Sequence, residues 1–211
     1  MPPDSASDRP ARFLGAVLAG GAGRRFGRPK GQVRLGGRSL PDRAADTLSR
    51  CCAEVVVVST VPVDTTRRVI PDRPEGIGPV GGLHAALREA DAGGRMGVLV
   101  LACDLPLVPP AVLEALAAAL GDGTAVAPTR AGGGIEPLCA AYGLRALPGV
   151  ASAATTGGGS LHALFDAVGG RAVEAAALGA GPDTFLNVNR PDDAERARVL
   201  LAGRAAQEVG P

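Results

Sequence analysis

The sequence is poor in aromatic side chains, with no tryptophan, one tyrosine and four phenylalanines in 211 residues. Proteins that bind single-stranded nucleic acid stack bases on aromatic rings, so this shortage argues against that class. An excess of one charge is also absent, because 22 Lys and Arg balance 21 Asp and Glu for a net charge of +1. We therefore predict no nucleic-acid partner, and any recognition of phosphate has to be local.

Long hydrophobic runs are missing as well. No window approaches the roughly 18 apolar residues of a membrane span, and the opening MPPDSASDRPA lacks the apolar run of a signal peptide. We predict a cytoplasmic protein with no membrane partner and a disordered tail over residues 1–11. Cysteine is scarce and lacks the CxxC spacing of zinc and redox sites. Buried free thiols in a reducing cytosol are expected for Cys51, Cys52, Cys103 and Cys139.

The hydrophobic residues that are present arrange themselves as alternating strands and helices. Short apolar runs rich in valine suit strands buried on both faces of a parallel sheet, and they lie at residues 13–18, 55–58 and 97–102. Helical patterns separate or follow them at residues 39–50, 81–90 and 109–120. This alternation predicts an α/β fold with a mostly parallel central sheet and right-handed crossovers.

The second half of the chain is less regular. We predict strands at 124–127 and 137–142 around a glycine turn at 131–134, a mobile loop at 155–159, a helix at 161–168 and a strand at 171–174. A last helix opens with Asp192, Asp193 and Glu195, where acids suit the positive end of the helix dipole. The length suits one domain, predicted over residues 12–203, with a frayed tail at 204–211.

The stretch LAGGAGRRFGRPKG, residues 18–31, has the composition of a phosphate-binding loop. It is neither a P-loop, because Lys30 is followed by glycine, nor a dinucleotide fingerprint, because Phe26 replaces the third glycine. Its physics still favours phosphate: glycines let backbone N–H groups approach a ligand, and Arg25 and Lys30 supply cations at a strand end. The alternative is a flexible surface turn with solvated arginines.

Three further segments carry candidate chemistry. Asp104 follows a buried strand directly, and a carboxylate there suits magnesium, although a helix-cap or turn role is the alternative. Residues 71–82 form a glycine- and proline-rich loop entering a helix, suited to a nucleotide or to an ordinary loop. Asn187 and Asn189 have strand spacing and would point to one side, toward a metal or substrate, with turn chemistry before a proline as the alternative.

Covalent catalysis has little support in the sequence. No Ser-His-Asp or Cys-His arrangement emerges, and His84 and His162 have no partner suggested by their neighbours. We interpret both histidines as packed or surface residues.

The order of these segments is more specific than any one of them. LAGGAGRRFGRPKG, VIPDRPEGIGPVGGLHAAL, LACDLPLVP, IEPLCAAY and FLNVNRPDD together closely resemble the molybdenum cofactor guanylyltransferases, among the nucleotidyltransferases that share LxGGxxxRxG…K and a later Asp-x-Pro. The resemblance runs from about residue 13 to about residue 201. It implies a Rossmann-like three-layer nucleotidyltransferase fold. It also implies Mg²⁺-dependent transfer of GMP from GTP to the terminal phosphate of molybdenum-bearing molybdopterin, with release of pyrophosphate.

The resemblance also assigns expected roles. The GTP site would include Leu18, Ala19, Gly20 and Gly21, with Asp72 on the guanosine side. Arg25 and Lys30 would face the phosphates, and Asp104 would contact GTP and hold magnesium; these three are the expected catalytic residues. Asn187 and Asn189 would lie near the metal and the pterin-side phosphate. Molybdoenzymes or their chaperones are the implied recipients of the product.

Two departures and several rival functions accompany this resemblance. Pro29 stands where many members have Asp, and Glu136-Pro137 where some have His-Pro, which affects details of pterin binding. Molybdopterin cytidylyltransferases usually have LAAG and Asp-Gln-Pro, whereas LAGG and Asp104-Leu105-Pro106 favour guanine. A phospholactate guanylyltransferase, a sugar-phosphate nucleotidyltransferase and a noncatalytic GTP-binding or cofactor-carrier protein are the remaining rivals. In an enzyme, Asp104→Ala would abolish pyrophosphate release and keep the fold.

Overall fold

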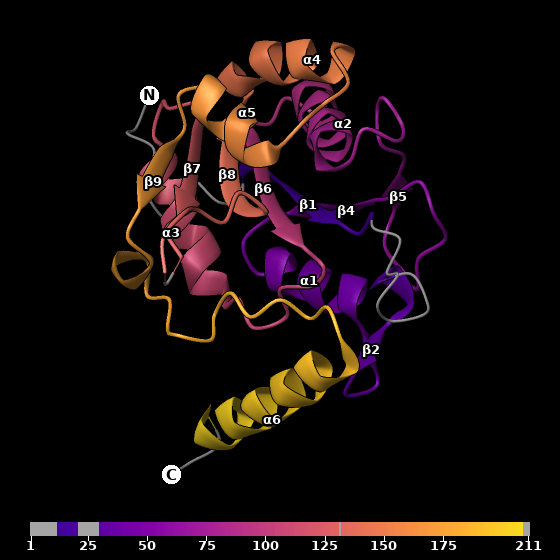
Figure 1. The fold of residues 1–211 in the computed structure, drawn as a ribbon, viewed down its shortest axis with the longest axis vertical. Helices are drawn as coiled ribbons and strands as arrows, with labels where there is room; N and C mark the ends of the chain where they lie inside the picture. The colour runs from indigo at the N-terminus through magenta and orange to yellow at the C-terminus, as the bar shows by residue number, and fades with distance from the viewer. Residues whose placement is uncertain (1–11, 21–29, 131, 209–211) are drawn as a thin grey trace.

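Seven short strands form the central sheet, in the order β5-β4-β1-β6-β8-β7-β9. The computed structural model describes residues 12–20, 30–130 and 132–208, and in it the sheet lies between two layers of helices (Figure 1). The strands are β1 (Leu14–Leu18), β4 (Glu54–Val58), β5 (Val69–Ile70), β6 (Gly97–Ala102), β7 (Ala125–Pro128), β8 (Cys139–Gly143) and β9 (Arg171–Val173). The three apolar runs predicted as strands are therefore confirmed.

The sheet is mostly parallel, as predicted. β1 pairs in parallel with β4 and β6, and β4 with β5. β8 reverses the direction, because it is antiparallel to both β6 and β7, and β7 then pairs in parallel with β9. The carboxyl ends of β1, β4, β6 and β7 consequently lie at one edge of the sheet, which is where open α/β sheets bind ligands.

A small hairpin, β2 (Arg34–Leu35) and β3 (Arg38–Ser39), stands apart from the main sheet. Its two-residue turn is Gly36-Gly37, with φ of 59° and 79°. Both angles are positive, which suits glycine and the tight turns of two-residue hairpins. The sequence analysis did not predict this hairpin, because its strands are too short to show an alternating pattern.

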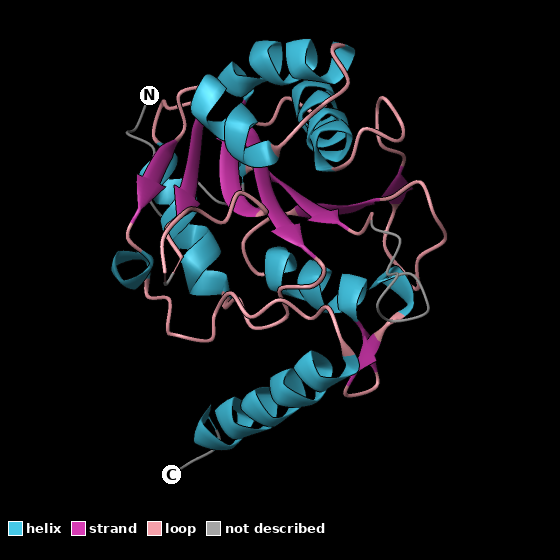
Figure 2. Ribbon diagram, viewed as in Figure 1, coloured by secondary structure: helices cyan, strands magenta, loops and turns pink. Residues whose placement is uncertain are grey.

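Helices cover both faces of the sheet (Figure 2). In the view of Figure 1, α2 (Pro79–Ala92), α4 (Leu147–Thr155) and α5 (Leu161–Ala167) lie above the sheet, and α1 (Leu40–Ser49), α3 (Pro110–Leu120) and α6 (Pro191–Glu208) lie below it. Short 3₁₀ helices occur at η3 (Lys30–Gln32), η4 (Leu144–Ala146) and η5 (Ala175–Leu178). Ser39 caps α1 by accepting from the backbone N–H of Asp42, 3.2 Å away.

The position of β1 in the sheet explains why its sequence is continuously apolar and does not alternate between apolar and polar residues. Phe13 and Val17 belong to the core on the α1 and α3 side, whereas Leu14, Ala16 and Leu18 belong to the core on the α2, α4 and α5 side. Each of these side chains is at most 9% exposed. A strand covered on both faces has no polar side, so the continuous apolar run follows from its place in the middle of the sheet.

Several boundaries differ from the predictions. α6 is described as far as Glu208, beyond the predicted domain end at residue 203, so the helix enters the stretch predicted as a tail. Helix α4 occupies residues 147–155, for which no element was predicted, and it runs into the expected 155–159 loop. Residues 187–189 lie in a stretch without regular secondary structure, not in a strand. The predicted disordered tail at 1–11 lies outside the described residues.

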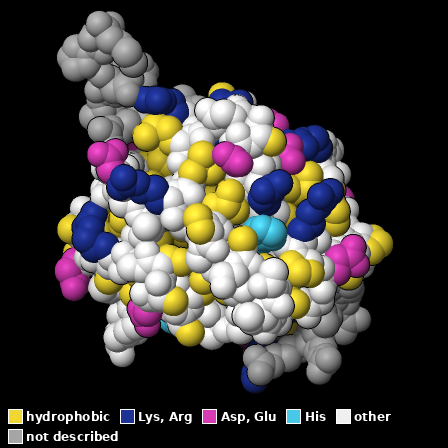
Figure 3. All heavy atoms as spheres, turned by 90° about the horizontal axis from the view of Figure 1, so that it is seen from above, with side chains coloured by type: hydrophobic (Ala, Val, Ile, Leu, Met, Phe, Trp, Pro, Cys, Tyr) yellow, Lys and Arg dark blue, Asp and Glu magenta, His cyan; other side chains and the backbone are white. Residues whose placement is uncertain are grey.

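The surface and the thiols agree with the balanced composition. Figure 3 shows the molecule from above the view of Figure 1, and on this face basic and acidic side chains are interspersed. All four cysteines of the chain are buried and none forms a disulfide, as predicted. Burial raises the pKa of Cys51 and of Cys52 to about 12, so neither is a ready nucleophile at neutral pH. Within the described chain, no helix is both long and apolar enough to span a membrane.

Candidate active site

The candidate site begins where three neighbouring strands end together. Leu18 of β1 is in register with Val58 of β4 and with Ala102 of β6. The pairing continues one residue into the loops, because Ala19 N donates to Val58 O at 3.0 Å and Cys103 N donates to Leu18 O at 3.1 Å. The three loops therefore leave the sheet side by side from fixed points.

A cavity of about 550 Å³ opens beside these strand ends. Its size falls in the range of small-molecule pockets. Its walls come from five chain segments: the ends of β1, β4 and β6, the glycine-rich loop of residues 71–82 that enters α2, and the residue just before β8. The described residues that line it are Leu18, Gly20, Val58, Thr60, Val61, Asp72, Gly76, Gly78, Pro79, Gly82, Ala102, Cys103, Asp104 and Leu138.

The start of α2 forms one wall because it carries no bulky side chains there. A Cβ added at Gly82 would lie 3.2 Å from Leu18 Cδ2 and 3.6 Å from Asp72 Oδ1. Gly78 precedes the helix with a φ of 72°, a conformation that glycine adopts without strain. The loop of residues 71–82, predicted as either a nucleotide-binding or an ordinary loop, thus borders the cavity.

Asp72 is one of the two carboxylates on the cavity wall. Its side chain is half-buried, and Gly20 and Gly82 lie beside it, since a Cβ at Gly20 would be 3.8 Å from Asp72 Oδ2. Burial, and secondarily the negative charge of Glu75, raise the pKa of Asp72 above its ordinary value. The structure thus brings together Leu18, Gly20 and Asp72, three residues that the sequence analysis predicted for one site.

Asp104 is the second carboxylate, and it is only 8% exposed. It directly follows the strand-end residues Ala102 and Cys103, as predicted. Its backbone oxygen accepts a hydrogen bond from Val188 N at 2.8 Å. This bond anchors the Asn187–Asn189 stretch next to Asp104, although the two segments are far apart in the sequence.

Two contacts fix the positions of Asn187 and Asn189: the hydrogen bond from Val188 N to Asp104 O, and those made by Asp193 at the start of α6. Val188 is fully buried between them, whereas both asparagine side chains are partly exposed. The backbone N–H groups of Asn189 and Arg190 donate to Asp193 Oδ2 at 2.9 and 2.8 Å, so Asp193 caps the turn into the helix. Neither asparagine is among the described residues that line the cavity. Both therefore lie beside Asp104 and off the cavity wall.

Some predicted residues cannot be placed. Gly21 and Arg25 lie outside the described residues, and so does the side chain of Lys30, whose backbone begins η3. Ala19 is described: it is fully buried, and its contribution to the site is its backbone pairing with β4.

The sequence analysis did not identify Glu136 as a site residue, although it noted that this residue departs from the family pattern. Glu136 is 4% exposed and lies just before β8. Its Oε2 lies 3.1 Å from Arg130 Nη1, and its Oε1 accepts from Leu138 N at 3.4 Å. Burial raises the pKa of Glu136, the charge of Asp104 raises it further, and Arg130 and His162 oppose the shift. A charged residue immediately before a buried strand was the available signal.

Thr60 and Val61, unlike Glu136, line the cavity, and the sequence analysis missed both. They follow the end of β4, so the rule that loops after parallel strands bind ligands would have found them. His84 is partly exposed and His162 is exposed, which agrees with the predicted packed or surface role. Each ring contacts a backbone oxygen: His84 Nδ1 lies 2.7 Å from Arg73 O, and His162 Nε2 lies 3.2 Å from Ile135 O.

The carboxylates limit which metal the site suits. Among the described residues, no group of three or more His, Cys, Asp or Glu side chains could enclose an ion. A single buried carboxylate at the edge of a cavity matches the way magnesium binds, through one or two carboxylates together with substrate phosphates and water. Asp104 therefore fits magnesium and fits a zinc or calcium cage poorly.

Comparison with known sequences agrees with this geometry. The MobA-like NTP transferase domain matches residues 15–174. A probable molybdenum cofactor guanylyltransferase from Pelotomaculum thermopropionicum is 32% identical over 192 residues, which cover 88% of this chain and 92% of that protein. A molybdenum cofactor guanylyltransferase from Desulfosudis oleivorans is 31% identical over 198 residues, covering 90% and 96%.

Solved structures share the fold. Molybdopterin-guanine dinucleotide biosynthesis protein A from Archaeoglobus fulgidus aligns with a TM-score of 0.75 at 28% identity, covering 90% of this chain and all of that one. The 2-C-methyl-D-erythritol 4-phosphate cytidylyltransferase from Thermus thermophilus aligns with a TM-score of 0.64 at 18% identity, which supports the fold alone. With the three-layer fold, the cavity at the strand ends and these matches together, the chain belongs to the MobA-like NTP transferase family and is a nucleotidyltransferase.

Proposed function

We propose that the protein transfers GMP from GTP to molybdenum-bearing molybdopterin, forming the guanine dinucleotide form of the cofactor and releasing pyrophosphate. The observation that carries this proposal is the cavity that joins the end of β1 to Asp72 and Asp104. The names of the relatives supply the substrates. LAGG and Asp104-Leu105-Pro106 favour guanine over cytosine.

The reaction needs positioning more than it needs acid or base catalysis. A terminal phosphate oxygen of the acceptor bonds to the α-phosphorus of GTP, and the bond from that phosphorus to the bridging oxygen of the β-phosphate breaks. Pyrophosphate leaves with that oxygen. Since the nucleophile is already an anion, no strong general base is required, and the main cost is bringing two polyanions together.

The site residues then have distinct proposed roles. Asp72, with Gly20 and Gly82 beside its carboxylate, would bind the guanosine part of GTP. The backbone of the glycine loop, with Arg25 and Lys30, would neutralise the triphosphate and the departing pyrophosphate.

The side of the site next to Asp104 would serve the acceptor. We propose that Asp104 holds Mg²⁺, which when bound supplies positive charge to phosphate oxygens. Asn187 and Asn189 would contact the acceptor phosphate beside it. The product would pass to molybdoenzymes or their chaperones in the cytoplasm, where the four buried cysteines, none of which forms a disulfide, remain reduced.

Release of pyrophosphate tests this proposal. The wild-type protein is supplied with GTP, Mg²⁺ and molybdenum-loaded molybdopterin, and with each component omitted in turn. We expect pyrophosphate only in the complete mixture. Asp104→Asn is the matched variant, because asparagine keeps the shape of this buried side chain while removing its charge.

Asp104→Asn should lower turnover by about 10²–10³-fold, the usual cost of losing a group that stabilises developing charge. Its thermal unfolding curve should match that of the wild type. A variant that keeps full turnover would remove Asp104 from the active site, and a wild-type protein that releases no pyrophosphate would contradict the proposed function.

A further inference from the structure

The segment between β4 and β5, residues 59–68, connects the cavity wall to η3, which lies at the end of the glycine loop of residues 18–31. Thr60 and Val61 line the cavity. The turn that carries them is closed by Ser59, whose hydroxyl donates to Val61 O at 2.8 Å and accepts from Val61 N at 3.2 Å. Beyond this turn the segment leaves the cavity and runs to η3 and α1.

Its contact with η3 is made at Gly31, the residue after Lys30. Asp64 N donates to Gly31 O at 2.9 Å. A Cβ added at Gly31 would lie 2.5 Å from Val63 Cγ1 and 3.1 Å from Val63 Cβ. Real side chains do not approach so closely, and valine is too short to swing away. Only glycine allows the segment to lie directly against η3.

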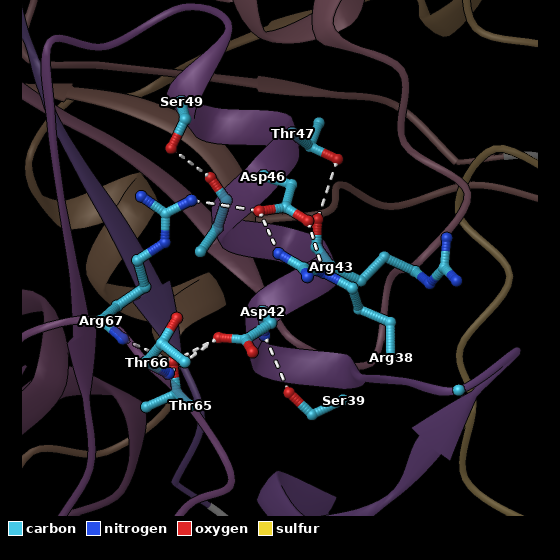
Figure 4. A network of polar contacts seen from close by, with 12 residues as sticks. Arg38, Ser39, Asp42, Arg43, Asp46, Thr47, Ser49, Thr65, Thr66 and Arg67 are labelled. Carbon is cyan, nitrogen blue, oxygen red and sulfur yellow. Dashed lines mark hydrogen bonds and ion pairs between the residues drawn. The ribbon is translucent and has the colours of Figure 1, made fainter.

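The same segment is fixed to α1 by one buried carboxylate (Figure 4). Asp42 Oδ1 accepts from the hydroxyl of Thr65 at 2.6 Å and from the backbone N–H of Thr66 at 3.2 Å. Asp42 is 9% exposed and lies in the first turn of the helix. The helix is itself packed on β1 through buried Ala44, Ala45 and Leu48, so the carboxylate is a rigid point of attachment.

Other charged contacts of this region lie at the surface. Arg34 Nε is 2.8 Å from Asp64 Oδ2, with both side chains well exposed, and Arg67 Nη2 is 3.0 Å from Asp46 Oδ1. Exposed ion pairs of this kind contribute little to stability. The buried Asp42 hydrogen bonds and the Gly31–Val63 contact are therefore the parts that hold the segment in place.

We infer that Gly31 and Asp42 are positioning residues for nucleotidyl transfer. Together they hold η3, and with it the backbone of Lys30, at a fixed place relative to the cavity wall at Thr60 and Val61. This inference rests on the proposed function, because it gives the end of the glycine loop a task in the reaction. Where catalysis depends on placing charges around a transferring phosphoryl group, a displacement of 1 Å costs about 10²-fold in rate.

Gly31→Ala is the direct test, with Val63→Ala as its second-site partner. The added methyl group should push η3 away from the segment and lower kcat with GTP by about tenfold or more. KM for the acceptor should stay near the wild-type value. Adding Val63→Ala removes the nearest colliding atom, so the double variant should recover most of the lost kcat, whereas Val63→Ala alone should be close to wild type.

Asp42 gives a test that does not depend on the tight contact. Asp42→Ala removes both accepted hydrogen bonds and should lower kcat in the same way. Asp42→Asn keeps an acceptor oxygen and should restore most of the activity. The matched control is Asp64→Ala, which loses only an exposed ion pair and keeps the backbone bond to Gly31; it should behave as wild type.

The outcomes separate this inference from the proposed function. If the wild type releases no pyrophosphate, the proposed function fails, and the positioning roles that rest on it fail with it. If the wild type is active, the inference is overturned by a Gly31→Ala protein with normal kcat. It is equally overturned if Val63→Ala does not rescue that variant, or if Asp42→Asn is as impaired as Asp42→Ala.

Discussion

The two halves of the sheet contribute to the site in different ways. On the β5-β4-β1-β6 side, the cavity is lined by glycines, apolar side chains and two carboxylates that follow strand ends. On the β8-β7-β9 side, the prominent feature is a buried charged residue, Glu136, paired with Arg130. The β5-β4-β1-β6 half leaves space for a ligand. The β8-β7-β9 half buries a charged side chain, which lowers the stability of the fold.

The predictions that test this comparison begin on the cavity side. Two adjacent glycines lie there, and substituting one should weaken ligand binding, whereas substituting the other should lower stability. Gly82 lines the cavity, and Gly81 lies against the backbone of the loop that precedes the helix, where an added Cβ would be 2.4 Å from Pro74 O. We expect Gly82→Ala to raise KM for GTP by about tenfold, since a crowded wall costs about 1–3 kcal/mol.

Gly81→Ala should act on stability instead. The expected loss is about 1–3 kcal/mol, and each kcal/mol lowers Tm by about 2–4 °C in a chain of this size. Steady-state kinetics and thermal unfolding of both variants make the check. If Gly82→Ala bound GTP normally but unfolded early, the cavity wall would have been assigned to the wrong glycine.

On the other side of the sheet, Glu136→Gln should separate function from stability. Glutamine keeps the acceptor for Leu138 N, and the freed Arg130 side chain, 41% exposed, remains solvated. We expect a stability within about 1 kcal/mol of the wild type. If the charge serves the reaction, turnover should fall by about three- to tenfold, the equivalent of about 0.7–1.4 kcal/mol.

The stability of this variant should also depend on pH in a defined direction. Because burial raises the pKa of Glu136 above 4.5, the folded protein holds this proton more tightly than the unfolded chain. Wild-type stability from this group is therefore full below pH 4.5 and is lost as pH rises through the raised pKa. The Tm of Glu136→Gln, relative to that of the wild type, should therefore rise as the pH is raised from 4.5 to 8. A Tm difference that does not change with pH would contradict the raised pKa of Glu136.

The smallest effect is expected from Glu75→Gln. The charge of Glu75 adds to burial in raising the pKa of Asp72, so its removal should lower that pKa toward the ordinary value of 3.8. If ionised Asp72 binds GTP, the acidic limb of the pH–rate profile moves to lower pH. At pH 7 the rate should change by less than about twofold, as for most exposed charges. An unmoved acidic limb would show that the ionisation of Asp72 does not control the rate.

The sequence predicted the cavity side better than the rest for a physical reason. Parallel strands buried on both faces are continuous apolar runs, and their carboxyl ends point to the site, so the strand end at Leu18 and the carboxylate of Asp104 could be found from local sequence. The role of Asp72 came from the family resemblance. The Asn187–Asn189 stretch was also found from local sequence, but the strand assumed for it was wrong, because hydrogen bonds to Asp104 O and to the Asp193 side chain hold it as a loop.

Contacts between distant segments could not be read in the same way. Gly31 requires glycine because Val63 lies against it, and Asp42 is buried because Thr65 and Thr66 donate to it. No periodicity or turn signal in either segment points to the other. Glu136 is similar, since its environment comes from Arg130, Asp104 and His162, which belong to three different parts of the chain.

A nucleotide panel tests the central claim most directly. The wild-type protein is given molybdenum-loaded molybdopterin and Mg²⁺ with GTP, CTP, ATP or UTP at equal concentration, and both pyrophosphate and the dinucleotide product are measured. The proposed function predicts turnover with GTP, a guanine dinucleotide as the product, and little reaction with the other three. Preferred turnover of CTP, or nucleotide binding without any pyrophosphate, would contradict it.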